Sequence, residues 1–310
     1  MHRHAYLLLV HKHPKQIKKL LELLDHELND IFIHIDKRSD MTPALFEGVC
    51  KKSRLVSIPR IDVQWGGTSI MNAEFELLRT AVPGGYRYYH LLSGMDLPIK
   101  SQDDIHKFFE ENDGEEFLTL WPNNRQTYES FHYRTIFPEN NRFILAKKLK
   151  AIYRFIEKKL NKTVNDDIQE RFASQWFSIT HDFARFILDN EKWAKKVFHL
   201  TSQTDELFVP TLLFRSPFAK NLYDANEYKE KQGTHEGGSL RFIDWTGEGI
   251  IRHPKTFRTE DFDKIMKSGC FWARKFDENT DSEIIDRIYA CISDTGTHQP
   301  ESVEETAQQS

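Results

Sequence analysis

The sequence predicts an α/β protein built on an open, doubly wound, mostly parallel sheet, and three observations support this. Short apolar runs that end in polar or turn residues recur along the chain. Segments with apolar residues at helical spacing lie between most of them. The first strand, helix and strand fit into about 30 residues, the length of a βαβ unit with a right-handed crossover. The predicted strands are residues 5–10, 31–36, 54–59, 88–92, 117–121, 174–179 and 240–245.

Each predicted helix has a local signal. Pro14 follows the first strand and suits the first turn of a helix, whose apolar residues recur from Ile17 to Leu24. The glycines at 66–67 precede a second helix, and Ser101 opens a third with a capping-box pattern. Further helices are expected from His181, over 204–214, from Thr259 and over about 281–292.

The 310 residues read as a single domain over 1–292. No internal repeat and no Pro/Gly/Ser-rich linker divides it, but residues of about 122–162 look like a helical insert. The polar tail at 293–310 has almost no large apolar residue, so we expect it to be disordered.

Composition excludes several classes of protein. A net charge of −4 is not that of a nucleic-acid-binding protein. The apolar run at 5–10 is too short for a signal peptide, and no run is long enough to span a membrane. Three distant cysteines form neither a metal motif nor a disulfide framework, which predicts a reducing, cytoplasmic environment.

In a doubly wound sheet the ligand lies beyond the carboxyl ends of the strands. The candidates there are Val10–His13, Asp36–Ser39, Trp65–Ser69, Ser93–Pro98 and Glu206. Asp36 ends a strand, where an acid either binds a base or ribose or simply begins a polar loop. Residues 11–14 stand in place of a glycine-rich phosphate loop, so a Rossmann dehydrogenase is not expected.

No metal site is expected. No central strand is followed by the DxD that most sugar-nucleotide transferases use, and the one match, Asp261–Asp263, falls at a helix start. Asp96 alone offers too few ligands. A diphosphate bound without metal would need cations, and the candidates are Arg252, Lys255, Arg258, Arg274 and Lys275, unless they are ordinary surface charges.

Glu206 lies in the most informative segment, where Thr204 and two carboxylates precede an apolar helix. First-turn carboxylates are usually caps or partners of the helix dipole. Since Thr204 or Asp205 would suffice as a cap, Glu206 is also a candidate general base on a rigid element. The residues alone leave both interpretations open.

Trp245 and the basic segment at 147–162 can each be interpreted in two ways. Trp245, beside Asp244, is the best candidate for a sugar-stacking ring, although a buried tryptophan is more often part of a core. Residues 147–162 hold seven Lys/Arg and one acid beside an apolar stripe at helical spacing. Such a helix either lies on an anionic membrane or packs with a solvated face. The stripe comprises Leu145, Leu149, Ile152, Tyr153, Ile156 and Leu160.

Taken together, the segments resemble the core-2/I-branching β-1,6-N-acetylglucosaminyltransferases and the related peptide O-xylosyltransferases, glycosyltransferase family 14. The resemblance runs in order over residues 5–277 and leaves out the insert and the tail. The matching segments are 6–12, 33–36, 65–70, 90–101, 174–178, 204–208, 241–245, 253–257 and 271–277.

The resemblance implies a GT-A-like fold, a UDP-sugar donor, inversion at the anomeric carbon and no metal or other cofactor. By resemblance Glu206 is the base and Lys275 binds the diphosphate, with Arg252 as its partner or Lys255 or Arg258 in its place. The implied donor site comprises Val10, His11, Asp36, Arg252, Arg274 and Lys275, and the acceptor site Trp65, Ser93, Asp96, Asp244 and Trp245.

The chain departs from the animal members, which are Golgi proteins with a membrane anchor, a stem and disulfides. It looks like a bacterial, cytoplasmic version that moves a sugar, GlcNAc in a β-1,6 linkage, to a glycan or lipid-linked saccharide in cell-surface polysaccharide synthesis. The basic helix at 147–162 would hold it at the cytoplasmic face of the membrane. A UDP-xylose-dependent enzyme and a non-catalytic UDP-sugar or carbohydrate-binding protein are the alternatives.

Overall fold

The structure is a computed structural model that describes residues 2–64, 66–134, 144–160, 162–223, 238–246 and 254–295. The strands are β1 His4–Val10, β2 Asn29–Ile35, β3 Arg54–Ser57, β4 Tyr88–Ser93, β5 Asp96–Pro98, β6 Phe117–Trp121, β7 Phe172–Thr180, β8 Arg241–Ile243 and β9 Trp272–Arg274. The helices are α1 Pro14–Leu24, α2 Thr68–Ala81, α3 Gln102–Glu111, α4 Arg125–His132, α5 Ile144–Lys159, α6 His181–Asp189, α7 Glu191–Val197, α8 Thr204–Phe214, α10 Phe262–Met266 and α11 Ser282–Thr295.

The main sheet has six strands in the order β3-β2-β1-β4-β7-β6. β1 pairs in parallel with β2 and β4, and β2 with β3, while β7 runs antiparallel to β4 and β6. This confirms the predicted α/β class with a mostly parallel sheet. The carboxyl ends of β1, β2 and β4 therefore meet at one edge, where the sequence placed the ligand.

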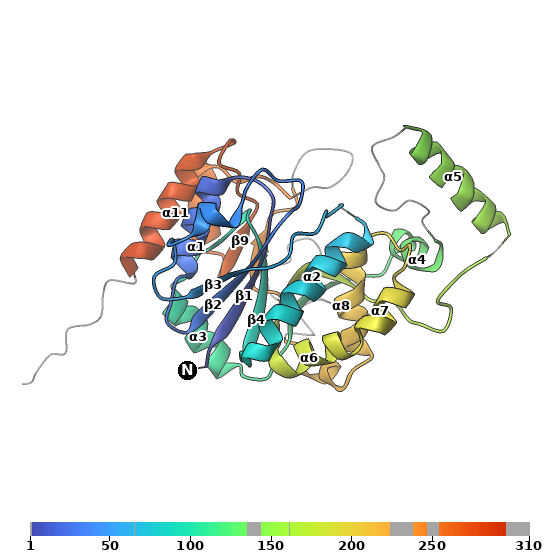
Figure 1. Ribbon diagram of the computed structural model, residues 1–310, viewed down its shortest axis with the longest axis horizontal. Helices are drawn as coiled ribbons and strands as arrows, with labels where there is room; N and C mark the ends of the chain where they lie inside the picture. Colours follow the sequence, from blue (N-terminus) through green and yellow to red (C-terminus); the bar gives the residue numbers. More distant parts are fainter. Residues whose placement is uncertain are drawn as a thin grey trace, which may run out of the picture.

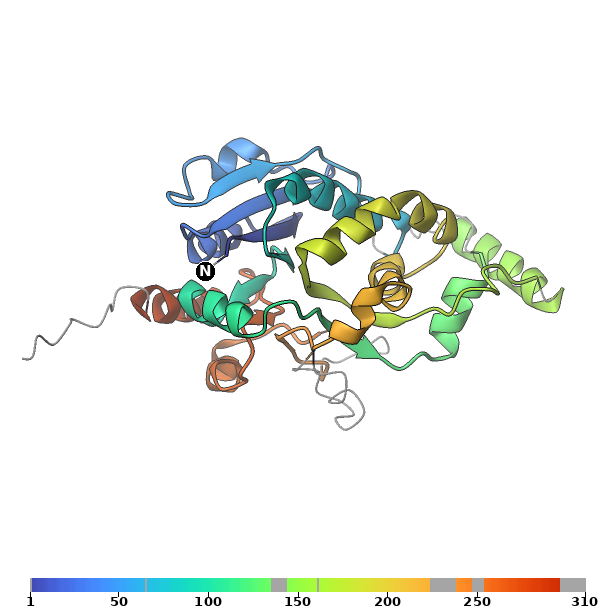
Figure 2. The same ribbon diagram turned by 90° about the horizontal axis from the view of Figure 1, so that it is seen from below.

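Helices cover both faces of this sheet (Figures 1 and 2). Tyr6, Leu8 and Val10 of β1 pack into a core shared with α1, α3 and α11, whereas Ala5 and Leu7 face a core shared with α2, α6 and α8. This alternation follows from the two-residue period of a strand. Full burial of each large apolar side chain contributes about 1.5–3 kcal/mol, so both layers fix the sheet edge firmly.

A second sheet, which the sequence did not predict, has the order β5-β9-β8. The expected strand at 240–245 belongs to it as β8 and not to the main sheet. A buried guanidinium, that of Arg241, joins the two sheets by donating to the carbonyls of Leu91 and Phe177. In β9, Arg274 lies opposite Asp96 of β5, so this small sheet positions two of the candidate site residues.

The predicted insert contains α4 and α5, and α5 stands away from the body of the molecule (Figure 1). At the other end of the chain α11 continues to Thr295, so the first residues of the predicted tail at 293–310 are helical. The rest of that tail lies outside the described residues.

Candidate active site

Glu206 lies in the first turn of α8, a helix that is otherwise almost entirely buried from Thr204 to Leu213. The Glu206 side chain is partly exposed, so an incoming group can reach it. The predicted cap is wrong, because the N-cap residue is Gln203, in the left-handed region with φ 57° and without a side-chain cap. The Thr204 hydroxyl donates to the Thr201 carbonyl instead (3.1 Å).

Gln203 orients the Glu206 carboxylate. Its amide nitrogen donates to Glu206 Oε2 (3.2 Å), and its amide oxygen accepts a hydrogen bond from the Ser130 hydroxyl of α4 (3.1 Å). Burial, and then the neighbouring charge of Asp205, raise the pKa of Glu206 above the range of an ordinary glutamate. A carboxylate whose pKa moves toward neutrality is better suited to accept a proton in a reaction.

A third carboxyl group, Glu74, escaped the sequence analysis. It lies on α2 with 0% exposure, and the Gln175 amide of β7 donates to its Oε1 (2.8 Å). The other oxygen has no hydrogen-bond partner. Burial raises the pKa of Glu74 well above its ordinary value, and the charge of Asp205 adds to this effect. The sequence did hold a signal for a buried acid here, because Glu74 lies four residues after Ile70, in the apolar face of α2.

Glu74, Asp205 and Glu206 form what we term the carboxyl cluster. Burial likewise raises the pKa of Asp205. Within the described part of the chain, no Lys, Arg or His forms an ion pair with any of the three. Unpaired buried carboxylates are costly, so the cluster holds protons more strongly than isolated acids do.

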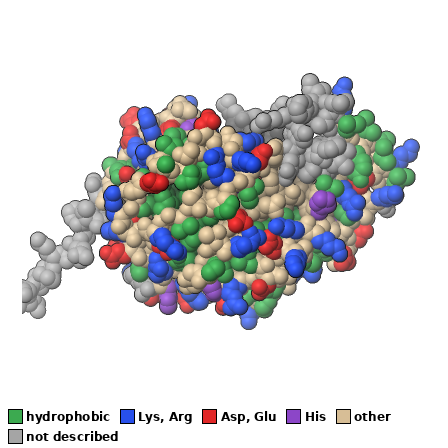
Figure 3. All heavy atoms as spheres, viewed as in Figure 1, with side chains coloured by type: hydrophobic (Ala, Val, Ile, Leu, Met, Phe, Trp, Pro, Cys, Tyr) green, Lys and Arg blue, Asp and Glu red, His purple; other side chains and the backbone are tan. Residues whose placement is uncertain are grey.

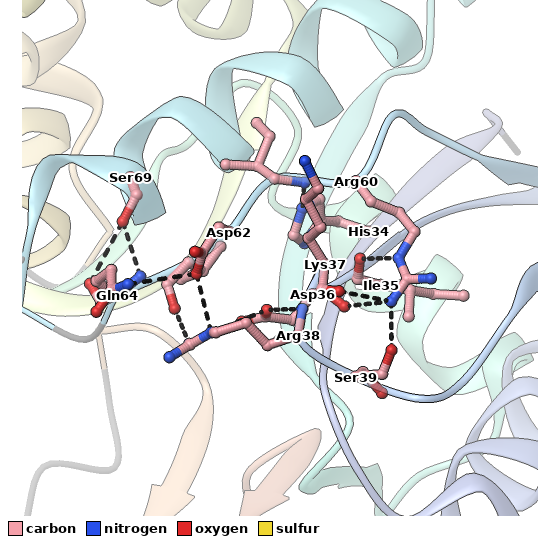
Figure 4. Close-up of polar contacts among 12 residues, drawn as sticks. His34, Ile35, Asp36, Lys37, Arg38, Ser39, Arg60, Asp62, Gln64 and Ser69 are labelled. Carbon is pink, nitrogen blue, oxygen red and sulfur yellow. Dashed lines mark hydrogen bonds and ion pairs between the residues drawn. The ribbon is translucent and has the colours of Figure 1, made fainter.

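Asp36 follows β2 and is 6% exposed. Its backbone N–H donates to the Val10 carbonyl (2.9 Å), which ties it to the end of β1. Its carboxylate accepts from the Arg38 backbone N–H (2.8 Å) and from the Arg38 guanidinium (3.1 Å), and Arg60 donates to its carbonyl (2.7 Å; Figure 4). The structure thus brings Val10 and Asp36 together, gives a contact to Arg38 of the candidate range 36–39, and adds Arg60, which the sequence analysis missed.

His11 continues β1 beside this acid, with an exposed ring. Partial desolvation and then the charge of Lys12 lower the pKa of His11, while the charge of Asp36 opposes them. The predicted base-binding residues therefore share one corner.

Residues 60–67 connect this corner to Glu206. Arg38 pairs with Asp62 (2.9 Å), and the backbone N–H of Gln64 donates to the Ser69 hydroxyl (2.8 Å; Figure 4). Next along the chain, the carbonyl of Gly66 accepts from the Gln203 N–H (3.2 Å). One segment thus runs from Asp36 to the start of α8, and Trp65 within it lies outside the described residues.

Arg274 occupies a polar corner made by the ends of β4, β5 and β9. Its guanidinium pairs with Asp96 (3.4 Å), lies 3.5 Å from the Ser93 hydroxyl and stacks 4.1 Å from the ring centroid of Trp176. The Ser93 backbone N–H donates to Asp96. The predicted acceptor residues Ser93 and Asp96 therefore contact the predicted donor residue Arg274.

Lys275 comes next and is partly exposed. No carboxylate of the described residues lies within ion-pair distance of it. Burial, then the charges of Arg274 and Lys12, lower the pKa of Lys275. The charge of Asp277 opposes this lowering. A partly buried ammonium close to two other cations is well placed to bind an anion.

Of the other predicted cations, Lys255 has its charged group engaged, whereas Arg258 is held through its backbone. Lys255 Nζ binds Asp261 (2.6 Å), and the Arg258 backbone N–H donates to the same carboxylate (3.0 Å). Arg252 lies outside the described residues.

The last two predicted acceptor residues follow β8. Asp244 binds Lys264 (2.8 Å), and although burial would raise its pKa, hydrogen bonds from Lys264 and Thr246 lower the pKa to about 2. The partly exposed Trp245 ring packs edge-to-face on Trp121, with centroids 5.3 Å apart. Because β8 and β9 are parallel and Ile243 pairs with Arg274, Asp244 and Lys275 leave the small sheet side by side.

Among the described residues, no group of three His, Cys, Asp or Glu side chains is arranged to hold a metal ion.

Comparison with known proteins places this arrangement in a family. Xylosyltransferase 2 of Canis lupus familiaris is 24% identical over 303 residues, which cover 92% of this chain and 33% of the relative. Xylosyltransferase 1 of Homo sapiens is 24% identical over 308 residues, covering 92% and 30% respectively. The chain thus spans about a third of the length of these relatives.

The apo crystal structure of mouse xyloside xylosyltransferase 1 aligns with 69% of this chain and 83% of its own, at 12% identity and a TM-score of 0.33. That similarity is too low to support a conclusion. By contrast, the sequence model of the Core-2/I-Branching enzyme family matches residues 4–266, most of the chain. The chain belongs to the Core-2/I-Branching enzyme family.

Proposed function

We propose that the protein is an inverting, metal-independent glycosyltransferase that moves a sugar from a UDP-sugar to a hydroxyl of a glycan. The observation that carries this proposal is the carboxyl cluster, whose partly exposed member, Glu206, has a raised pKa and forms no ion pair with the described residues. Family membership supports the same reaction class.

In this proposal the Glu206 carboxylate takes the proton of the acceptor hydroxyl while that oxygen attacks C1 of the donor sugar. The bond between C1 and the diphosphate oxygen breaks, and UDP leaves with its added negative charge. Lys275 and Arg274 neutralise that charge, so the leaving group needs no proton. Asp36, with Val10 and His11, holds the uracil.

Two donors fit. The resemblance to the core-2/I-branching β-1,6-N-acetylglucosaminyltransferases favours GlcNAc transferred in a β-1,6 linkage, whereas the names of the relatives favour xylose. Thermal-shift screening with UDP-GlcNAc, UDP-xylose and UDP-glucose, followed by UDP-release assays on glycan acceptors, separates the two. A protein that binds a UDP-sugar but never releases UDP would be a non-catalytic binder.

Glu206→Gln tests the assignment of the base, because it keeps the shape and removes the proton acceptor. We expect UDP release with acceptor to fall at least about a thousandfold while the Kd of UDP stays within about threefold. Glu191→Gln is the matched control, since Glu191 is a first-turn acid of α7. Turnover retained in Glu206→Gln would refute the role.

Metal independence is tested separately. EDTA should leave turnover nearly unchanged, and strict dependence on Mn²⁺ would contradict the mechanism.

We also propose that α5 brings the enzyme to an anionic membrane that carries its lipid-linked acceptor. Five of the eight exposed large hydrophobic side chains in the described chain lie on or just after α5, where they gather at one end of the molecule (Figure 3). They are Leu149, Ile152, Phe155, Ile156 and Leu160. Exposed apolar side chains gathered in this way mark interaction sites.

The orientation of α5 supports this contact. Two of its charged residues contact the protein, since Glu157 is 7% exposed and Lys158 pairs with Glu129 of α4 (2.7 Å). The apolar side faces outward and is flanked by the exposed Lys148 and Lys159. An outward apolar face beside lysines is typical of helices that lie in a lipid interface. No helix in the described residues is long and apolar enough to cross a membrane.

Vesicle flotation tests this contact. The protein should float with vesicles of anionic phosphatidylglycerol and less with neutral ones, and Ile152→Ser with Phe155→Ser should abolish flotation. Lys148→Glu with Lys159→Glu should reduce it, whereas Lys15→Glu with Lys18→Glu, on the exposed side of α1, is the charge-matched control. Flotation unchanged by either α5 pair would disprove the contact.

A bacterial, cytoplasmic origin is a further part of the proposal. Three free cysteines fit a reducing compartment.

A further inference from the structure

An ion pair and several hydrogen bonds join the end of β1 and the start of α1 to the segment that follows β9. Lys12 Nζ lies 2.8 Å from Asp277 Oδ2. The Gln16 backbone N–H donates to Glu278 Oε2 (2.7 Å), and the Glu278 backbone N–H donates to Gln16 Oε1 (3.0 Å). The Gln16 amide also donates to the Gly94 carbonyl (2.7 Å). These contacts bring residue 12 to the corner where Lys275 leaves β9.

Lys12 is close to both parts of the proposed donor site. Its charge is among those that lower the pKa of Lys275, after burial and Arg274, and it also lowers the pKa of His11. Its side chain is 39% exposed, so its ammonium group is open to a ligand. An ammonium has three N–H donors, and Asp277 is its one ion-pair partner in the described residues.

The local backbone explains why a side chain is needed here. In doubly wound sheets the turn after β1 usually binds phosphate through backbone N–H groups at the start of the next helix. Here α1 begins with Pro14, which has no N–H, and the turn contains no glycine. A lysine can supply the missing donors and charge.

We propose that Lys12 is a further cation that holds the diphosphate of the donor, in addition to Lys275 and Arg274. The inference rests on the proposed UDP-sugar chemistry. It adds a cation to the candidates that the sequence left open, of which Lys255 is bound to Asp261 and Arg252 lies outside the described residues.

Calorimetric titration with UDP and with uridine tests the inference. Lys12→Met should weaken UDP binding about tenfold or more and leave uridine binding unchanged, because uridine has no phosphate. Lys12→Arg should keep most of the UDP affinity. Lys18→Met is the matched control, since Lys18 lies exposed on α1.

Asp277→Asn separates a direct contact from a structural one. This substitution removes the ion pair between Asp277 and Lys12 but keeps the lysine. UDP affinity should therefore remain within about threefold or rise. If Asp277→Asn and Lys12→Met weaken UDP binding alike, Lys12 acts through the fold and the inference is overturned. UDP affinity unchanged in Lys12→Met but lost in Lys275→Met also overturns it, and leaves the proposed function intact. If the wild-type protein fails to bind UDP, the proposed function and this inference both fail.

Discussion

Among the described residues, the charged groups at one end of the site are mostly ion-paired, whereas those at the other end are not. At the proposed donor site, which comprises Lys12, Asp36, Arg274 and Lys275 and which we term the donor corner, most charges are matched, since Lys12 pairs with Asp277, Arg274 with Asp96 and Asp36 with Arg38. At the start of α8 the carboxyl cluster has no ion pair within the described residues, and its polar contacts are hydrogen bonds from amides such as Gln175 and Gln203.

This difference has a chemical meaning. Ion pairs hold cations in fixed positions, which suits the binding of a charged donor. Unpaired carboxyl groups instead raise one another's pKa, which suits the movement of a proton. We infer that binding and proton transfer are divided between the two ends.

The largest expected effect at the donor corner comes from Lys275→Met. Lys275 forms no ion pair with the described residues. Its removal should therefore weaken UDP binding by about 1.5–3 kcal/mol, the usual contribution of a hydrogen bond to a charged group. Titration calorimetry measures it, with Lys267→Met on the exposed surface as the control. An unchanged UDP affinity would remove Lys275 from the donor site.

Glu74→Gln tests the other end through stability. Burial raises the pKa of Glu74, so the folded protein keeps a proton that the unfolded chain releases near pH 4.3. The stability of the wild type should therefore fall as pH rises toward that raised pKa. Gln has no such proton, so the stability of the variant relative to wild type, measured by urea unfolding, should increase as pH rises. A difference that does not vary with pH would show that Glu74 does not titrate in this way.

Asp36→Asn should have the smallest effect. It weakens the contacts with Arg38 and with the uracil, so uridine and UDP binding should both weaken by about 0.5–1.5 kcal/mol. Asp62→Asn, which changes the exposed partner of the same arginine, is the control. Loss of UDP binding alone would place Asp36 at the phosphates.

Much of the fold could be predicted because its signals are local. Strand and helix periods identified β1, α1, β2 and the other main elements, and with them the positions of Asp36 directly after β2 and of Glu206 in the first turn of α8. The small sheet could not be predicted, because β5, β8 and β9 have three residues each and pair across distant parts of the chain.

The parts of the site that escaped prediction depend on tertiary contacts. Glu74 and Gln175 lie 101 positions apart and meet only because α2 packs near β7. Lys255 reads as a free cation in the sequence and is bound to Asp261 in the structure. In α5 the periodicity located the apolar stripe, but only the fold shows that it faces outward.

The pH dependence of kcat/KM for sugar transfer, measured for the wild type and for Asp205→Asn, tests the central claim most directly. If Asp205 raises the pKa of Glu206, activity in the wild type should rise with pH near neutrality as Glu206 loses its proton. Asp205→Asn removes the neighbouring charge, so the rise should move to lower pH. A wild-type rise near pH 4–5, or one that Asp205→Asn leaves in place, would contradict the role of the carboxyl cluster.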